Sequence, residues 1–107
     1  TPLGASMNST ELTDSINHAL SSRGAQFAFG AETLRIPGAM ISLNGSIDGH
    51  PVRFDFNGPD NVAEGVYVVW AFDPRTKNQI GDVSAPSGFP AALERMDWSN
   101  LLGARTH

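Results

Sequence analysis

The sequence contains no cysteine, which excludes disulfide bonds, thiolate nucleophiles and cysteine-ligated zinc sites. It also lacks any run approaching the roughly 18 apolar residues that a membrane-spanning helix requires. The phosphate-binding P-loop pattern, the dinucleotide fingerprint and the serine nucleophile motif G-x-S-x-G do not occur. These absences remove the common catalytic and cofactor-binding motifs, so we expect no cofactor and no membrane span.

Basic residues are few and scattered along the chain. Seven lysine and arginine residues stand against eleven acidic ones, a formal net charge of -4, and only Arg75 and Lys77 lie close together. Because phosphate binding needs a concentrated basic face, this distribution argues against a nucleic acid partner. With 107 residues, 40% hydrophobic and 17% charged, the chain has the size and composition of one ordinary globular domain.

The N-terminal residues precede the first predicted helix. We expect residues 1–8 to form a flexible segment and residues 9–107 a single α+β domain. Two origins stay open for residues 1–6: they are native, or they derive from an expression vector and Met7 is the natural first residue. If Met7 is the initiator, the lack of a signal peptide favours the cytoplasm. Otherwise the compartment stays open.

Helical periodicity marks both ends of the domain. A helix is predicted over residues 9–22, where Asn8 is a suitable N-cap, Gly24 a suitable end, and one apolar stripe recurs at helical spacing. The stripe consists of Leu12, Ile16, Ala19 and Leu20. Near the C-terminus, Pro90 predicts the first turn of a second helix, and Asp97 can cap a further turn.

Alternation between apolar and polar residues predicts strands from residue 26 onwards, with a hairpin between residues 41 and 57. Closing this hairpin at Asn44-Gly45 would mix apolar and polar side chains on each face. A four-residue loop, Asp48 to Pro51, keeps one face apolar and is therefore predicted. That register pairs Ile47 with Val52, Gly45 with Phe54 and Leu43 with Phe56.

The run from Gly65 to Phe72 is apolar on both faces and predicts the central strand. One row, made of Val66, Val68, Trp70 and Phe72, is expected to face the core. The other row, made of Tyr67, Val69 and Ala71, is a candidate interface, because two short helices are not expected to cover both faces of a sheet. Burial under the chain's own helix is the alternative for this second row.

These elements predict an α+β fold, in which a curved antiparallel sheet of four to six strands packs with an N-terminal and a C-terminal helix. The alternative is an immunoglobulin-like β-sandwich with the helices as appendages. In that alternative, Val66, Val68 and Trp70 would face a second sheet instead of the helix predicted over residues 9–22.

Two sets of residues are candidates for binding. The first is apolar and suits a protein interface: Tyr67, Val69, Ala71, Trp98, Leu101 and Leu102. The second is polar and lies in the predicted loops 48–51 and 57–64: Asp48, His50, Asn57, Asp60 and Asn61. The last three of the apolar set have the spacing of a helix that docks in a groove, and they also suit the domain's own core.

The sequence contains only weak patterns for metal binding and for acid–base catalysis. Oxygen ligands crowd between Asp55 and Glu64, but the EF-hand calcium spacing fails, since Pro59 and Asp60 occupy its fifth and sixth positions. No metal site is predicted. His18 lies one helical turn from Asp14, a spacing that suits general acid–base catalysis and equally an ordinary surface pair.

Three functions remain open. The favoured one is a non-enzymatic protein-interaction or assembly module that self-associates or docks on a protein partner. The second is a secreted or surface-exposed ligand-binding domain that uses loops 48–51 and 57–64. The third is a small hydrolase or isomerase that uses His18 or His50. No sequence motif identifies the partner, the ligand or the oligomeric state.

Overall fold

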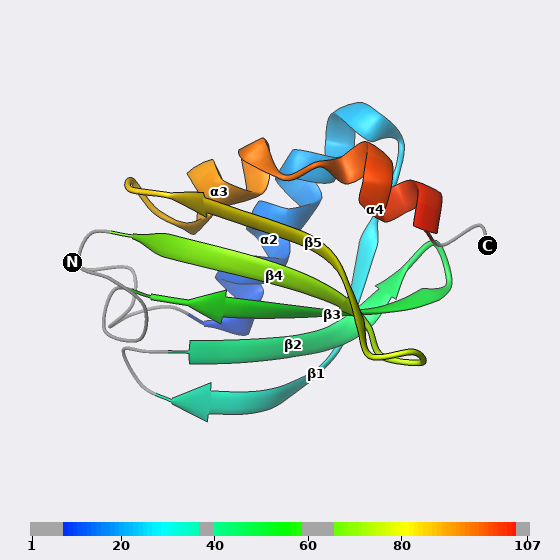
Figure 1. Ribbon diagram of the computed structural model, residues 1–107, viewed down its shortest axis with the longest axis horizontal. Coiled ribbons are helices and arrows are strands. Elements are labelled where there is room, and N and C mark those ends of the chain that lie inside the picture. The colour runs from blue at the N-terminus through cyan, green and yellow to red at the C-terminus, as the bar shows by residue number, and fades with distance from the viewer. Residues whose placement is uncertain (1–7, 37–39, 59–65, 105–107) are drawn as a thin grey trace.

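The computed structural model describes residues 8–36, 40–58 and 66–104, so most of the predicted N-terminal segment lies outside the described residues. Figure 1 shows one sheet with the helices gathered on one side of it. The elements in chain order are α2 (Ser9–Leu20), the 3₁₀ helix η1 (Ser21–Arg23), β1 (Phe27–Ile36), β2 (Met40–Ile47), β3 (His50–Asn57), β4 (Tyr67–Asp73), β5 (Asn78–Ala85), α3 (Phe89–Arg95) and α4 (Trp98–Ala104).

The five strands follow one another in the sheet in the order β1-β2-β3-β4-β5, and every neighbouring pair is antiparallel. The sheet is open, with β1 at one edge and β5 at the other. This confirms the predicted α+β fold with terminal helices. The immunoglobulin-like alternative is wrong for the part of the chain that the structure describes, because helices and not a second sheet cover the core side of the strands.

Helix α2 forms where the periodicity predicts it. The Asn8 side chain accepts a hydrogen bond of 2.8 Å from the Glu11 backbone N–H, which satisfies one of the unpaired donors at the helix start. The whole predicted stripe is buried. After η1, Gly24 adopts a left-handed conformation with φ of 66° and ends the helical segment.

The β2–β3 hairpin has a shorter turn than predicted. Asp48 and Gly49 alone form the turn, both with positive φ, and the paired residues are Ile47 with His50, Gly45 with Val52 and Leu43 with Phe54. The predicted register was wrong by two residues on β3, although both registers place the same side chains on each face. Pro51 fits the shorter turn because its position pairs with Ser46 without exchanging backbone hydrogen bonds, so the missing N–H is not needed there.

The assignment of faces along β4 was wrong. Val69 and Ala71 are fully buried under the helices, whereas Val68, Trp70 and Phe72 lie on the opposite, helix-free face and are half-buried. Both rows are apolar, so β4 by itself does not distinguish them. The pairing with β3 does: Phe56 and Phe54 point to the helices and lie directly opposite Val69 and Ala71.

Aromatic rings join the sheet to the C-terminal helices. Phe54 contacts the Trp98 ring, with centroids 6.1 Å apart. Phe56 and Tyr67 each form a T-shaped pair with Phe89, at centroid distances of 5.3 and 5.1 Å. The C-terminal helix breaks at Met96, and Asp97 caps the new turn by accepting a bond from the Asn100 N–H, as predicted.

Strand β1 joins the core through its first residue. The Phe27 ring is 2% exposed, packs edge-on against Phe54 and crosses β2 directly over Gly45. A methyl group at position 45 would lie 2.2 Å from the Ala28 carbonyl oxygen and 2.7 Å from two carbons of the Phe27 ring. Gly45 is therefore required for the close approach of β1 and β2.

The first prediction follows from this contact. Gly45→Ala should lower the free energy of unfolding by at least about 2 kcal/mol, because backbone and ring must both move to admit the methyl group. Gly81→Ala is the matched control: its added methyl group would meet Met96, Ala71 and Leu101 at 3.6 to 3.7 Å, ordinary contact distances, so its effect should stay below about 1 kcal/mol. Urea unfolding of both variants measures the difference, and equal midpoints would contradict the packing described for Phe27.

Candidate functional site

The residues predicted as an interface belong to the chain's own core. Val69, Ala71, Trp98 and Leu101 are between 0% and 2% exposed, while Tyr67 and Leu102 are partly buried against them. Trp98 also donates its indole N–H to the Leu93 carbonyl oxygen at 2.8 Å. The premise that the second row of β4 stays uncovered is therefore wrong, because two short C-terminal helices together with α2 suffice to cover that face.

The structure does not bring the predicted loop residues together. Asp48 and His50 lie at the turn end of β3, and Asn57 lies at its other end, seven residues further along the strand and about 23 Å away at the usual rise. Asn57 is also buried. Asp60 and Asn61 lie outside the described residues.

The two histidine candidates lie on different elements, His18 on α2 and His50 at the start of β3. The His18 Nε2 lies 3.6 Å from a Glu94 carboxylate oxygen on α3, with both side chains exposed, and this contact links α2 to α3. His50 lies beside the β2–β3 turn. Within the described residues, no group of three or more histidine, cysteine or acidic side chains could hold a metal ion, and no helix has the length and apolar character needed to cross a bilayer.

Exposed apolar side chains gather instead on β1. Phe29, Leu34 and Ile36 are 44%, 43% and 47% exposed, and they are the large hydrophobic residues that the described chain leaves open to solvent. After Phe27, every residue of β1 is exposed, because the strand extends along the lower edge of the sheet, away from α3 and α4 (Figure 1). An edge strand of this kind is a template on which another strand can pair.

The backbone of β1 also faces outward at defined positions. In an antiparallel pair, residues alternate between those that exchange hydrogen bonds with the neighbour and those whose N–H and C=O point away. The hairpin closure at Ile47 and His50 sets this alternation for β2 and therefore for β1, and it directs the backbone groups of Phe27, Phe29 and Glu32 outward. These groups form the outer edge on which a further strand would bond.

A side chain occupies the first of these positions. Asn17 on α2 accepts a 2.7 Å bond from the Phe27 N–H and donates a 3.1 Å bond to the Phe27 carbonyl oxygen. Its amide thus bonds as the backbone of a neighbouring strand would. Among the described residues, no side chain does the same for the outward groups of Phe29 and Glu32.

The opposite edge of the sheet is more fully covered. On β5, the Asn100 amide of α4 donates to the Ile80 carbonyl oxygen at 3.1 Å, and the Arg95 guanidinium of α3 donates to the Ser84 carbonyl oxygen at 3.4 Å. The C-terminal helices therefore protect β5, and this leaves β1 as the accessible edge.

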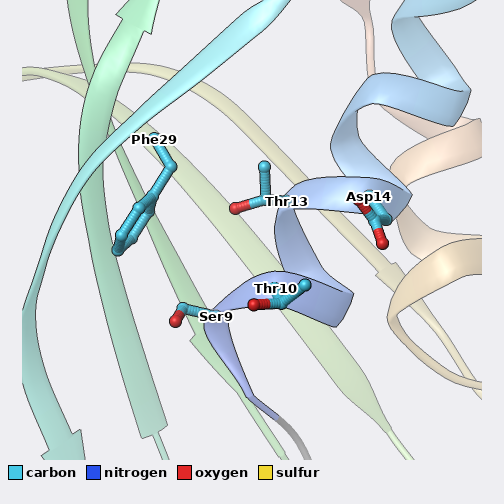
Figure 2. Close-up of a pocket in the computed structure, with 5 residues that line it drawn as sticks. All are labelled: Ser9, Thr10, Thr13, Asp14 and Phe29. Atoms are coloured by element: carbon cyan, nitrogen blue, oxygen red, sulfur yellow. The ribbon is translucent and has the colours of Figure 1, made fainter.

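A hollow lies beside β1 on the helix side. It is open, measures about 140 Å³ and is lined by Ser9, Thr10, Thr13, Asp14 and Phe29. Figure 2 shows the side chains of Ser9 and Thr13 directed toward the Phe29 ring, with Asp14 further along the helix. The Thr13 hydroxyl oxygen is shielded from solvent and has no hydrogen-bond partner. The hollow thus provides space and a polar group next to the edge.

The helix-free face of the sheet carries exposed apolar side chains of β1 and, further across the sheet, a charged pair beside an aromatic ring. Leu34 lies opposite Ser42 and Ile36 opposite Met40, so both point to this side. Further across the sheet, the Arg53 Nε lies 3.2 Å from an oxygen of the buried Asp55 carboxylate. The Arg53 guanidinium also stacks 4.3 Å from the centre of the Phe72 ring.

Two opposite charges lie on β1 itself. The Arg35 guanidinium donates two hydrogen bonds to the Glu32 carboxylate, at 3.0 and 2.6 Å. These bonds, together with the positive charge of Arg35, hold the pKa of the Glu32 carboxyl below its ordinary value of 4.5. The same pairing raises the pKa of Arg35.

Sequence reasoning missed β1 as the exposed edge. The segment was expected to form short strands or one bent strand, and the structure has one strand with two register shifts. Strand periodicity does not say which strand ends the sheet or which faces stay open. The usable signal in the sequence was Gly30, which interrupts the alternation of this segment. In the structure, the β1–β2 register shifts between Phe29 and Ala31 and between Glu32 and Leu34, as in a strand that leaves the regular ladder.

A scan against protein-family models, a search of curated proteins and a search of solved structures each found no match for this chain.

The bond pair of Asn17 leads to a second prediction. Asn17→Ala should lower the free energy of unfolding by about 1 to 3 kcal/mol, since two partly buried backbone groups of Phe27 lose their partner. Gln26→Ala, at an exposed position beside Phe27, should change it by less than about 0.5 kcal/mol. Denaturant unfolding compares the two. An Asn17 variant as stable as the Gln26 variant would contradict the role of Asn17 at the edge.

The ion pair on β1 leads to a third prediction. Because the pKa of Glu32 is lowered in the folded state, the pair stabilises the fold above the ordinary value of 4.5 and ceases to do so as the pH falls through the folded pKa. Arg35→Gln should move the pKa of Glu32 up toward 4.5, which a carboxyl-carbon NMR titration measures.

The control for this titration is Arg75→Gln. Arg75 lowers the pKa of Asp73 on the β4–β5 turn in the same way, so its removal should shift Asp73 toward 3.8 and leave Glu32 unchanged. A Glu32 midpoint that does not respond to Arg35→Gln would show that another group lowers it.

Proposed function

We propose that this domain is a protein-interaction module that binds an extended segment as an additional strand along the outer edge of β1. The observation that carries this proposal is the concentration of exposed large apolar side chains on one edge strand: Phe29, Leu34 and Ile36. In strand addition, backbone hydrogen bonds supply affinity and side-chain contacts on alternate positions supply specificity.

The positions of these side chains favour strand addition over docking on a sheet face. Phe29 lies opposite Gly45 and points to the helix side, whereas Leu34 and Ile36 point to the helix-free side. A partner that lay on one face would cover only part of this set. A strand at the edge runs along both faces at once, so it can bury apolar surface on each side of β1.

The edge also carries features that limit indiscriminate pairing. Two register shifts interrupt the regular β1 ladder, and Glu32 and Arg35 place charges along the exposed strand. Charges and bulges at an edge disfavour pairing with an unmatched strand. A partner must therefore match both the irregular backbone and the charges, which supports a selective interaction.

The other two functions receive less support. The described loop candidates Asp48, His50 and Asn57 lie at opposite ends of β3, so they do not form one ligand site. In the described part of the chain, His18 contacts the exposed Glu94, and neither His18 nor His50 belongs to a group of three or more histidine or acidic side chains that could hold a metal ion. The interaction module is therefore the function that we carry forward, with its surface moved from β4 to β1.

A point variant on the edge tests the proposal. Leu34→Lys places a charge where the added strand would bury a leucine, so it should reduce the amount of bound partner by at least about tenfold. The matched control is Gln79→Lys, which adds the same charge at an exposed position of β5, the opposite edge. Tagged chains are compared for the proteins they retain in native extracts of the source cells, and retained complexes are analysed by amide hydrogen exchange.

The expected result has two parts. The complex of the unmodified chain and that of Gln79→Lys should contain the same partner, with slowed exchange at Phe29 and Glu32, and Leu34→Lys should lose it. If Leu34→Lys retains the partner, or if slowed exchange is confined to β5 or the helices, strand addition at β1 is wrong.

A further inference from the structure

The two charges on β1 are arranged so that the strand is complementary to itself. Glu32 lies opposite Leu43 and Arg35 opposite Ile41, two core residues of β2, so both charged side chains point to the helix side of the sheet. On the basis of the proposed strand addition, we propose that the added strand is β1 of a second copy of this chain. It runs antiparallel, with Glu32 of each copy opposite Arg35 of the other.

In this register the residues next to the charge pairs also come opposite compatible residues of the other copy. In an antiparallel pair, each step forward on one strand is a step back on the other, so Ala31 comes opposite Ile36 and Thr33 opposite Leu34 of the other copy. Ala31 and Ile36 lie opposite Asn44 and Met40 on β2, and both point to the helix-free side. An apolar pair therefore forms on one face while the charge pairs form on the other.

The irregularity of β1 is what makes this possible. In a regular strand, residues three positions apart point to opposite faces, and so would Glu32 and Arg35. The register shift between Glu32 and Leu34 places both on the helix side. It likewise brings Ala31 and Ile36, five positions apart, to one face. The shift that makes β1 a poor match for a regular strand makes it a match for its own copy.

Two other symmetric registers place like charges directly opposite each other. Centring the pair on Glu32 would set one carboxylate opposite the other, and centring it on Arg35 would do the same for two guanidinium groups. Like charges directly opposite each other destabilise a strand pair. The register proposed here has two opposite-charge pairs instead.

The result would be a continuous ten-stranded sheet across two chains of five strands each. The contact is one strand wide, so we expect it to fall at the small, reversible end of protein interfaces and to depend on concentration. The Leu34 side chains of the two copies would lie next to each other at the centre of the pair, where they would lose much of their exposure to solvent.

Charge exchange tests this arrangement. Light scattering of the full-length chain over a concentration series should show a mass rising from 11.4 kDa toward twice that value. Glu32→Arg and Arg35→Glu should each weaken self-association by at least about tenfold, since each sets like charges opposite one another. An equimolar mixture of these two variants should restore association, because every cross-chain pair then joins Arg to Glu. The double variant E32R/R35E should also associate as the unmodified chain does.

The equimolar mixture distinguishes charge pairing between two copies from the loss of the ion pair within one strand. Both single variants lose the ion pair within their own strand, and mixing them restores no pair within either chain. Association in the mixture therefore requires contact between copies in the proposed register. If the mixture stays monomeric while E32R/R35E associates, the charges act within the strand and the register is wrong. Cooperative thermal unfolding of the single variants establishes that they are folded.

Failure of this inference is distinct from failure of the proposed function. If the unmodified chain stays monomeric up to millimolar concentration, the second copy is not the partner. Strand addition still stands in that case if Leu34→Lys, but not Gln79→Lys, loses a different captured protein. If the chain self-associates and neither the charge variants nor Leu34→Lys weaken it, both are overturned.

Discussion

The close crossing of Phe27 over Gly45 is the contact on which the layout of this protein depends. It brings one end of β1 into the aromatic core and holds it there, because no side chain at position 45 blocks the ring. Asn17 then satisfies the outward backbone groups of the same residue. Beyond this point β1 keeps its pairing with β2 but leaves the cover of the helices, and all its further residues are exposed. The first residue of β1 is therefore fixed in the core, while the rest of the strand lies exposed.

The sheet therefore has two unequal edges. Helices α3 and α4 contribute Arg95 and Asn100 to the carbonyl groups of β5, whereas α2 contributes Asn17 to only the first residue of β1. An open antiparallel sheet always leaves two rows of unpaired backbone groups, and here helices cover one row far better than the other. The proposed interaction site arises from this asymmetry. It needs no pocket and no catalytic group.

Irregularity and charge have a combined effect on β1. Register shifts and charged residues normally protect an edge from pairing. In this strand, the shift between Glu32 and Leu34 turns Glu32 and Arg35 to the same face, so a device that excludes unmatched strands also creates a self-complementary pattern. Selectivity of this kind follows from backbone geometry as much as from the identity of the side chains.

The sequence by itself determined the α+β class, the cap and apolar stripe of α2, and the break between the C-terminal helices at Asp97. These depend on spacing along the chain, and local periodicity is sufficient to reveal them. Only the tertiary structure decided which apolar row of β4 is buried, how tight the β2–β3 turn is, and which strand lies at the open edge. Val68 and Val69 are chemically equivalent, so pairing with Phe54 and Phe56 and cover by the helices had to distinguish them. The two hairpin registers place the same side chains on each face, so the apolar pattern does not choose between them. The candidate site was not predictable for the same reason, because the exposure of β1 depends on where helices distant in sequence pack.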